Sequence, residues 1–197
     1  MDLALFDFDG TITSRETFPD FMYATVPPRR LAMGKVLLAP LILGYKAGLV
    51  SGTVVRAAIV RFGLRGLPLA QVEAVAEELA RTVLPGLIRA HAMQRIRWHQ
   101  ARGDVVVVVS GGFDVYLRHW CDAHGVQLIC SSLEQADGML TGRYAGAQCV
   151  SAAKVARVRE RYELARFGRV YAYGDTREDR ELLGLADEAY LGWERVI

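Results

Sequence analysis

Five short apolar runs, spread over the whole chain, constrain its fold more than any other feature. Each is bounded by Gly, Asp or Ser and lacks a regular polar face, which is typical of parallel strands covered on both sides. Helical patterns lie between them, notably over Asp114–His124 and Ala152–Arg166. We therefore predict an α/β fold with a doubly wound parallel sheet, whose ligands bind beyond the carboxyl ends of the strands. The runs are Leu3–Phe6, Val105–Val109, Gln127–Cys130, Val170–Tyr173 and Ala189–Leu191.

A long insertion separates the first two runs. Residues 7–104 are far more chain than one crossover between parallel strands needs. We predict a helical cap domain over residues 17–82, inserted after the first strand, and a core domain made of residues 1–16 and 83–197. Within the cap, Gln71–Thr82 has apolar residues at helical spacing. Further on, Leu133–Tyr144 carries Asp137-Gly138 between two short segments, which predicts a β-hairpin.

One segment of the predicted cap, Leu31–Val50, has the length of a membrane span. Lys35, Pro40 and Lys46 interrupt it, and the uninterrupted apolar part, Val36–Tyr45, is too short to cross a bilayer core of roughly 30 Å. We predict a helix or helix pair, broken near Pro40 and buried against its neighbours. A lipid-facing role at a membrane surface is the alternative.

Charge and composition exclude several classes of protein. The 24 basic and 22 acidic residues give a net charge of +2, which offers no clustered basic excess for a nucleic-acid partner. Three aspartates stand among the first nine residues, where an export signal would carry basic residues, so we expect a cytoplasmic protein. The three cysteines, Cys121, Cys130 and Cys149, form no C-x-x-C pair and are expected to be free and buried.

Four polar segments follow or end predicted core elements. The first, Asp7-Phe8-Asp9-Gly10-Thr11, places two carboxylates directly after the first strand, which is costly unless a cation binds there. The others are Ser110-Gly111-Gly112, Lys154 near a helix start, and Gly174-Asp175-Thr176 followed by Asp179. Each alone is weak evidence, because such residues also occur in ordinary turns. Together they indicate a magnesium site that performs phosphoryl transfer.

These four segments resemble the motifs of a known family. DFDGT, VVVVVSGG, Lys154 and YGDTREDRELL look like the four motifs of the haloacid-dehalogenase superfamily of aspartate-nucleophile phosphatases. The position of the cap, VSGGF and the stretch DGMLTGRYAGAQC narrow the resemblance to the phosphoserine-phosphatase-like branch, subfamily IB. The resemblance covers Leu3 to Leu191. It implies a Rossmann-like core with a small helical cap, and Mg²⁺-dependent hydrolysis of a phosphomonoester.

The resemblance assigns different tasks to chemically identical residues. Asp7 is the expected nucleophile, since its carboxylate can attack phosphorus and form an aspartyl-phosphate. Asp9 is expected to protonate the leaving oxygen and then activate water. The family pattern takes the ligands of Mg²⁺ from the Asp7 carboxylate, the Asp9 backbone carbonyl and the Asp175 carboxylate. Asp179 would hold metal-bound water or orient these ligands.

The same resemblance supplies the expected phosphate-binding residues. Lys154 would neutralise phosphate charge and pair with Asp7. Ser110 and the Gly111 N–H would bind the phosphoryl oxygens, because glycine lets the backbone approach closely. Thr11 is expected beside them, with a hydroxyl that orients the turn.

Substrate identity depends on the cap, where the signals differ. Glu16 matches a glutamate that contacts the amino-acid end of the substrate in phosphoserine phosphatases, although it could equally be an exposed hinge charge. A cap arginine belongs to that pattern, and Arg56 and Arg61 are both candidates. We expect a small phosphorylated metabolite, with phosphoserine the nearest named candidate and histidinol phosphate among the others. The apolar stretch Leu31–Tyr45 looks more like the caps of relatives that act on phosphatidylglycerophosphate or lysophosphatidate.

Two readings without turnover remain beside this one. A phosphoacceptor module of the response-regulator kind also groups acids, a hydroxyl and a lysine around magnesium, but it needs its acceptor aspartate after a middle strand and no long insertion. A catalytically silent phosphate-binding module would keep the fold alone. For the cap surface, the sequence leaves open a homodimer contact or a peripheral membrane contact.

Overall fold

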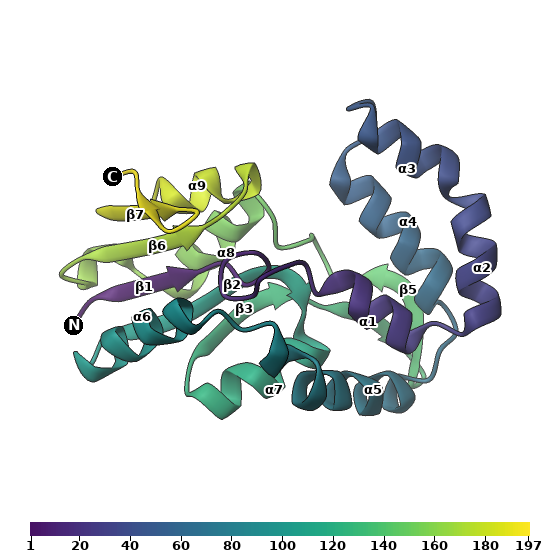
Figure 1. Cartoon of the computed structure of the whole chain (residues 1–197), viewed down its shortest axis with the longest axis horizontal. Helices are drawn as coiled ribbons and strands as arrows, with labels where there is room; N and C mark the ends of the chain where they lie inside the picture. Colours follow the sequence, from purple (N-terminus) through teal and green to yellow (C-terminus); the bar gives the residue numbers. More distant parts are fainter.

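A six-stranded sheet forms the centre of the fold (Figure 1). The computed structural model describes residues 1–197. Neighbouring strands pair in parallel, except that β8 runs antiparallel to β7. The α/β fold with a doubly wound parallel sheet is thus confirmed. The order is β3-β2-β1-β6-β7-β8, formed by β1 (Leu3–Phe6), β2 (Val105–Phe113), β3 (Gln127–Ser131), β6 (Val170–Gly174), β7 (Glu188–Leu191) and β8 (Glu194–Arg195).

Alternate residues of the central strands pack into two separate cores. On β1, Ala4 and Phe6 face the larger core, whereas Leu3 and Leu5 face the smaller one. All four side chains are buried, which explains why the strand shows no polar face. Helices α5 (Leu69–Thr82), α6 (Ala90–Ala101) and α7 (Asp114–His124) contribute to the larger core, and α8 (Ala152–Arg161) and α9 (Arg180–Leu183) to the smaller.

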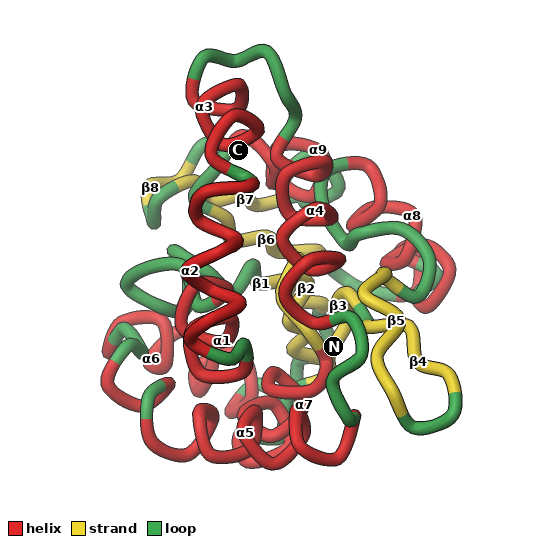
Figure 2. Tube along the Cα trace, turned by 90° about the vertical axis from the view of Figure 1, so that its right-hand side faces the viewer, coloured by secondary structure: helices red, strands yellow, loops and turns green.

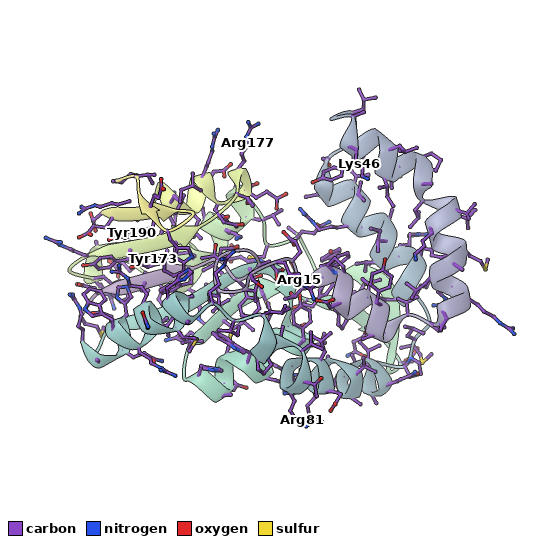
Figure 3. All side chains as sticks on the ribbon, viewed as in Figure 1. Arg15, Lys46, Arg81, Tyr173, Arg177 and Tyr190 are labelled. Atoms are coloured by element: carbon purple, nitrogen blue, oxygen red, sulfur yellow. The ribbon has the colours of Figure 1, made fainter.

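Aromatic side chains reinforce the larger core along neighbouring strands. The rings of Tyr173 on β6 and Tyr190 on β7 are stacked, with their centroids 4.9 Å apart (Figure 3). Tyr173 also stacks on Phe6 at 4.2 Å and contacts His99 Nε2 through its hydroxyl at 2.9 Å. This stack continues across β1, β6 and β7, so it stabilises the middle of the sheet near the strand ends.

Two element boundaries differ from the sequence-based expectation. Strand β2 continues past Val109 to Phe113, so Ser110-Gly111-Gly112 lies within the strand end, where the pairing with β3 shifts register. Helix α8 ends at Arg161, not at Arg166, because Tyr162 adopts an extended conformation and its hydroxyl donates a hydrogen bond to Gln127 Oε1 at 2.6 Å. This tertiary contact with β3 is invisible to local periodicity. Short 3₁₀ turns occupy Leu84–Gly86, Leu164–Arg166 and Arg177–Asp179.

Helices of the inserted segment extend the molecule beyond the sheet. Helices α2, α3 and α4 project from one end, whereas α5 lies beside α7 and below α1 (Figures 1 and 2). The packing of α5 into the larger core ties the end of the insertion to the core. The proposed division into 1–16 with 83–197 and 17–82 stays a prediction. The bounds of the remaining helices are α1 (Phe18–Thr25), α2 (Pro28–Leu37), α3 (Ala39–Lys46) and α4 (Gly52–Leu64).

The apolar segment of the insertion is broken where expected but is not buried. The break falls at Leu38, and Pro40 is the second residue of α3. The expected burial is wrong for most of the segment, because α3 has no buried residue and α2 buries only Gly34. Its physical cause is the lack of a further layer, since α4 covers only one side of the pair. None of the helices combines the length and the apolar composition that a membrane-spanning helix needs.

The predicted hairpin forms and packs on this projecting part. Strands β4 (Leu133–Ala136) and β5 (Met139–Tyr144) pair antiparallel and lie beside α4 (Figure 2). Gly142 on β5 has φ +79°, and a Cβ there would lie 2.9 Å from the carbonyl oxygen of Arg61 on α4. The backbone of the hairpin therefore approaches the backbone of α4 at a point that only glycine permits.

This contact predicts a large cost for Gly142→Ala. The left-handed conformation alone should cost roughly 1–2 kcal/mol, and the overpacking against α4 should add about 1–3 kcal/mol. Gly146→Ala is the matched control, because Gly146 has φ +83° but no neighbour within 4 Å of an added Cβ. Urea unfolding of both variants measures the difference. Equal losses of unfolding free energy would contradict the close approach.

Candidate active site

The predicted site residues come from four separate elements and meet at one edge of the sheet. Asp7 follows β1, Ser110 lies near the end of β2, Lys154 lies in the first turn of α8, and Asp179 follows β6. They line a cavity of about 60 Å³ at the carboxyl ends of the parallel strands. Asp9, Gly111, Glu16 and Arg56 line the same cavity, together with Phe18, Gly112, Val150, Thr176 and Glu178.

Lys154 is the electrostatic centre of this site. Its ammonium lies 2.5 Å from Asp7 Oδ1 and 2.7 Å from Asp179 Oδ1, and all three side chains are buried. Burial lowers the pKa of Lys154, but the two carboxylates together raise it by more. The pKa of Lys154 therefore lies above its ordinary value. Lys154 therefore stays charged and fixes the Asp7 carboxylate in place.

Asp179 organises the loop that carries Asp175. Its Oδ2 accepts hydrogen bonds from the Asp175 N–H at 3.2 Å and from the Thr176 N–H and hydroxyl, both at 3.1 Å. Thr176 in turn caps the 3₁₀ turn that starts at Arg177. One carboxylate thus holds both Lys154 and the loop, and the Asp175 side chain is directed toward Asp7 and Asp179.

The arrangement of these carboxylates fits a magnesium ion. Carboxylate oxygens of Asp7, Asp175 and Asp179 lie within 4.8 Å of one another, and the buried Oδ1 of Asp175 has no hydrogen-bond partner. Burial raises the pKa of Asp7 and also that of Asp175, and a cation bound between them would stabilise their ionised forms. A Cβ at Gly10 would lie 2.0 Å from Asp175 Oδ2, so this glycine is required for the approach of Asp175.

Asp9 lies in a different environment from Asp7. Its Oδ1 accepts hydrogen bonds from the Thr17 N–H at 2.9 Å and from the Thr17 hydroxyl at 2.6 Å. Burial raises the pKa of Asp9 to about 7, although the Thr17 hydrogen bonds oppose that shift. The Thr17 hydroxyl also lies 3.1 Å from the Tyr116 hydroxyl. Asp9 can therefore gain and lose a proton near neutral pH.

Thr17 was not found by sequence reasoning. It precedes α1, where a threonine ordinarily caps the helix through its hydroxyl, yet it makes no such cap. Its hydroxyl is used by Asp9 instead. The local signal therefore indicated a helix start, and only the folded loop brings Thr17 to Asp9.

The hydroxyl that orients the first loop is that of Thr13, not that of Thr11. Thr13 Oγ1 accepts a hydrogen bond from the Gly10 N–H at 3.1 Å and donates one to the Arg15 carbonyl at 2.8 Å. Thr11 Oγ1 is buried without a hydrogen-bond partner, and Thr11 does not line the cavity. The expected role of the Thr11 hydroxyl in the turn is thus taken by a residue two positions later.

Of the two candidate cap arginines, only Arg56 reaches the cavity. Its Nη2 lies 3.0 Å from Glu178 Oε1, and its Nε donates to Gln148 Oε1 at 3.2 Å. These contacts join α4 to the two loops that precede α8 and α9. Arg61 is exposed on the same helix and lies outside the cavity. Glu16 lines the cavity from the side of the first loop.

Comparisons with known proteins agree with this geometry. Residues 4–184 match the family model of haloacid dehalogenase-like hydrolases. The chain belongs to this family. This result confirms the predicted superfamily and the prediction that the chain is an enzyme, a hydrolase.

Individual relatives extend the comparison. The chain is 32% identical over 188 residues to protein CicA from Caulobacter vibrioides, which covers 94% of this chain and 83% of CicA. It is 31% identical over 121 residues to a histidinol-phosphatase from Neisseria meningitidis, which covers 57% of this chain and 53% of that protein. A phosphoserine phosphatase structure holding a phospho-aspartyl intermediate analogue superposes with a TM-score of 0.69 at 24% identity, covering 96% of this chain and 85% of the other. The phosphoserine-phosphatase-like fold is thereby confirmed.

The position of Lys154 predicts a strong effect of Lys154→Met on stability. Removing the ammonium leaves the buried carboxylates of Asp7 and Asp179 without their partner, and such a loss typically costs about 3–5 kcal/mol. Denaturant unfolding in metal-free buffer measures it. Adding Asp179→Asn in the Lys154→Met background should recover part of the loss, because one buried charge is removed. An unchanged unfolding free energy in Lys154→Met would refute this role.

Proposed function

We propose that this hydrolase is a Mg²⁺-dependent phosphomonoesterase that cleaves a small phosphorylated metabolite through an aspartyl-phosphate on Asp7. The observation that carries the proposal is the contrast between two aspartates in one loop. Asp7 is held by Lys154, whereas Asp9 is held by Thr17 and has a pKa of about 7. A nucleophile and a proton carrier are the two groups that such a reaction needs.

The reaction follows from these positions. A carboxylate oxygen of Asp7 attacks phosphorus, the ester bond breaks, and protonated Asp9 gives its proton to the leaving oxygen. Asp9 then takes a proton from the water that hydrolyses the aspartyl-phosphate. Lys154, the Ser110 hydroxyl and the Gly111 N–H bind the phosphoryl oxygens. Asp7, Asp175 and the Asp9 carbonyl would hold Mg²⁺, which would supply positive charge that offsets the repulsion between two anions.

The charged rim of the cavity favours a small polar substrate, of which phosphoserine is the nearest example. The cavity is small, about 60 Å³, and Glu16 and Arg56 line it. A carboxylate and a guanidinium suit an ester that carries both an amino group and a carboxylate. Histidinol phosphate is a further candidate, supported by the relative named histidinol-phosphatase.

A lipid phosphate is the second candidate, and one observation favours it. An apolar pocket of about 250 Å³ lies between α1, α2 and α4, and Phe18 lines both this pocket and the catalytic cavity. An ester whose phosphate occupied the cavity could place an apolar chain past Phe18. A panel of phosphoserine, histidinol phosphate and lysophosphatidate, compared by kcat/KM, distinguishes the two candidates.

The central prediction is that purified protein releases phosphate from an aryl phosphate only with Mg²⁺. Chelation by EDTA should abolish turnover and added Mg²⁺ should restore it, because the carboxylates need a cation. Asp7→Asn should lose all turnover, since an amide is not a nucleophile here. Full activity in Asp7→Asn would refute the nucleophile assignment. If phosphate stayed on Asp7 of the wild-type protein without release, the chain would be a phosphoacceptor. If the wild-type protein did not react at all, it would be a silent binding module.

Thr17 provides a test of the role of Asp9. Thr17→Val removes the hydroxyl that opposes the raised pKa of Asp9, so the apparent pKa should rise further. The limb of the kcat profile that reports ionised Asp9 as base should then move to higher pH, with lower kcat at neutral pH. Thr17→Ser, which keeps the hydroxyl, should retain the wild-type profile. A shift of equal size in both variants would contradict the assignment.

A further inference from the structure

An exposed apolar surface lies on the arm, which we define as residues 28–50, comprising α2, α3 and the loop that follows. The exposed fractions of four large apolar side chains are 75% for Val36, 61% for Leu37, 65% for Leu43 and 84% for Leu49. Singly exposed apolar residues are ordinary, but a group of this size in one short segment is not. The arm therefore carries a group of apolar side chains that water solvates poorly.

The spacing of these residues places them along one side of the arm. Met33 lies three residues before Val36 and four before Leu37, and Pro40 and Leu43 follow Leu37 at intervals of three residues across the break at Leu38. The opposite side faces α4, where Gly34 packs against Phe62. The arm projects from the sheet on the side of the cap in Figure 1, and Figure 3 shows Lys46 near its outer end.

The charge of the same region is one-sided. Residues 21–72 contain seven basic residues and no acidic residue, whereas the other 145 residues carry a net charge of −5. The acidic residues that flank this range in the sequence already form ion pairs, Asp20 with Arg15 and Glu73 with Arg118. Arg29, Lys35 and Lys46 are exposed on the arm and make no ion pair.

We propose that the arm docks on the surface of an anionic lipid bilayer. Apolar side chains such as Leu37 and Leu43 enter the boundary between headgroups and acyl chains, as they do in interfacial helices. Arg29 and Lys46 lie at the level of the anionic headgroups, which attract each basic residue near the surface. This docking is a property of the arm and does not depend on the chemistry of the catalytic cavity.

Charge complementarity decides between a bilayer and a second copy of this chain. A symmetric dimer through the arm would place the same patch on both sides of the contact. Basic residues would face basic residues, and residues 21–72 offer no carboxylate to pair with them. An anionic bilayer supplies both the apolar environment and the opposite charge.

Vesicle binding tests the apolar part of the proposal. Wild-type protein should float with vesicles of mixed phosphatidylglycerol and phosphatidylcholine, and bind vesicles of phosphatidylcholine alone much less. The double variant Leu37→Asp/Leu43→Asp should lose about tenfold or more of the binding, because it removes apolar contacts and adds negative charge. The control is Val196→Asp/Ile197→Asp, which makes the same change at two exposed apolar residues of the C-terminus, and it should bind like wild type.

A charge variant tests the electrostatic part. Arg29→Glu/Lys46→Glu should weaken binding to the anionic vesicles and reduce its dependence on salt, whereas Arg97→Glu/Arg159→Glu, at exposed sites outside the arm, should not. All these variants should hydrolyse a water-soluble aryl phosphate at the wild-type rate. Thus loss of activity bears on the proposed function, and loss of vesicle binding bears on the arm.

Three outcomes would overturn the proposal. The first is that wild-type protein does not bind anionic vesicles, and the second is that the arm variants bind them as well as wild type does. The third is that wild-type protein binds no vesicles but forms a dimer, which Leu37→Asp/Leu43→Asp dissociates. Sedimentation velocity in lipid-free buffer provides the last measurement.

Discussion

A single buried ammonium holds the functional edge of this protein together. Lys154 contacts Asp7 after β1 and Asp179 after β6, and Asp179 in turn binds the backbone of the loop that carries Asp175. These residues come from both ends of the chain, so their contact requires the completed sheet. One positive charge against several buried carboxylates leaves a negative excess. The same imbalance that makes the site costly to fold makes it suited to a magnesium ion.

The sheet and the inserted segment supply different residues of the site. Strands β1, β2 and β6 bring Asp7, Ser110 and Asp179 to one edge, and their parallel pairing sets the spacing. The insertion supplies Thr17, which tunes Asp9, and Arg56, which crosses from α4 to Glu178. Asp7 and Ser110 thus lie at the edge of the sheet, whereas Thr17 and Arg56 come from the inserted segment beside it.

The sheet and the residues at its edge could be predicted from the sequence because both depend on local patterns. Apolar runs mark the strands, and the polar residues that follow them necessarily meet at one edge of a parallel sheet. The sequence alone did not indicate whether Arg56 or Arg61 reaches the site, because the two lie on the same helix but point about 140° apart. The rotation of α4 depends on its packing against α2, α3 and the hairpin, where Gly142 contacts its backbone. Nor did the sequence indicate Glu178 and Gln148 as partners of Arg56, since those contacts join three distant segments.

The sequence by itself determined the fold class, the place of the insertion and the set of charged residues at the strand ends, since periodicity and short motifs are properties of adjacent residues. Only the tertiary structure decided that Thr13 orients the first loop, that Asp9 pairs with Thr17, and that the apolar arm stays exposed. The arm shows the physical reason most clearly. An apolar helix is buried only if another layer covers it, and no periodicity within residues 28–50 records whether the rest of the chain provides that layer.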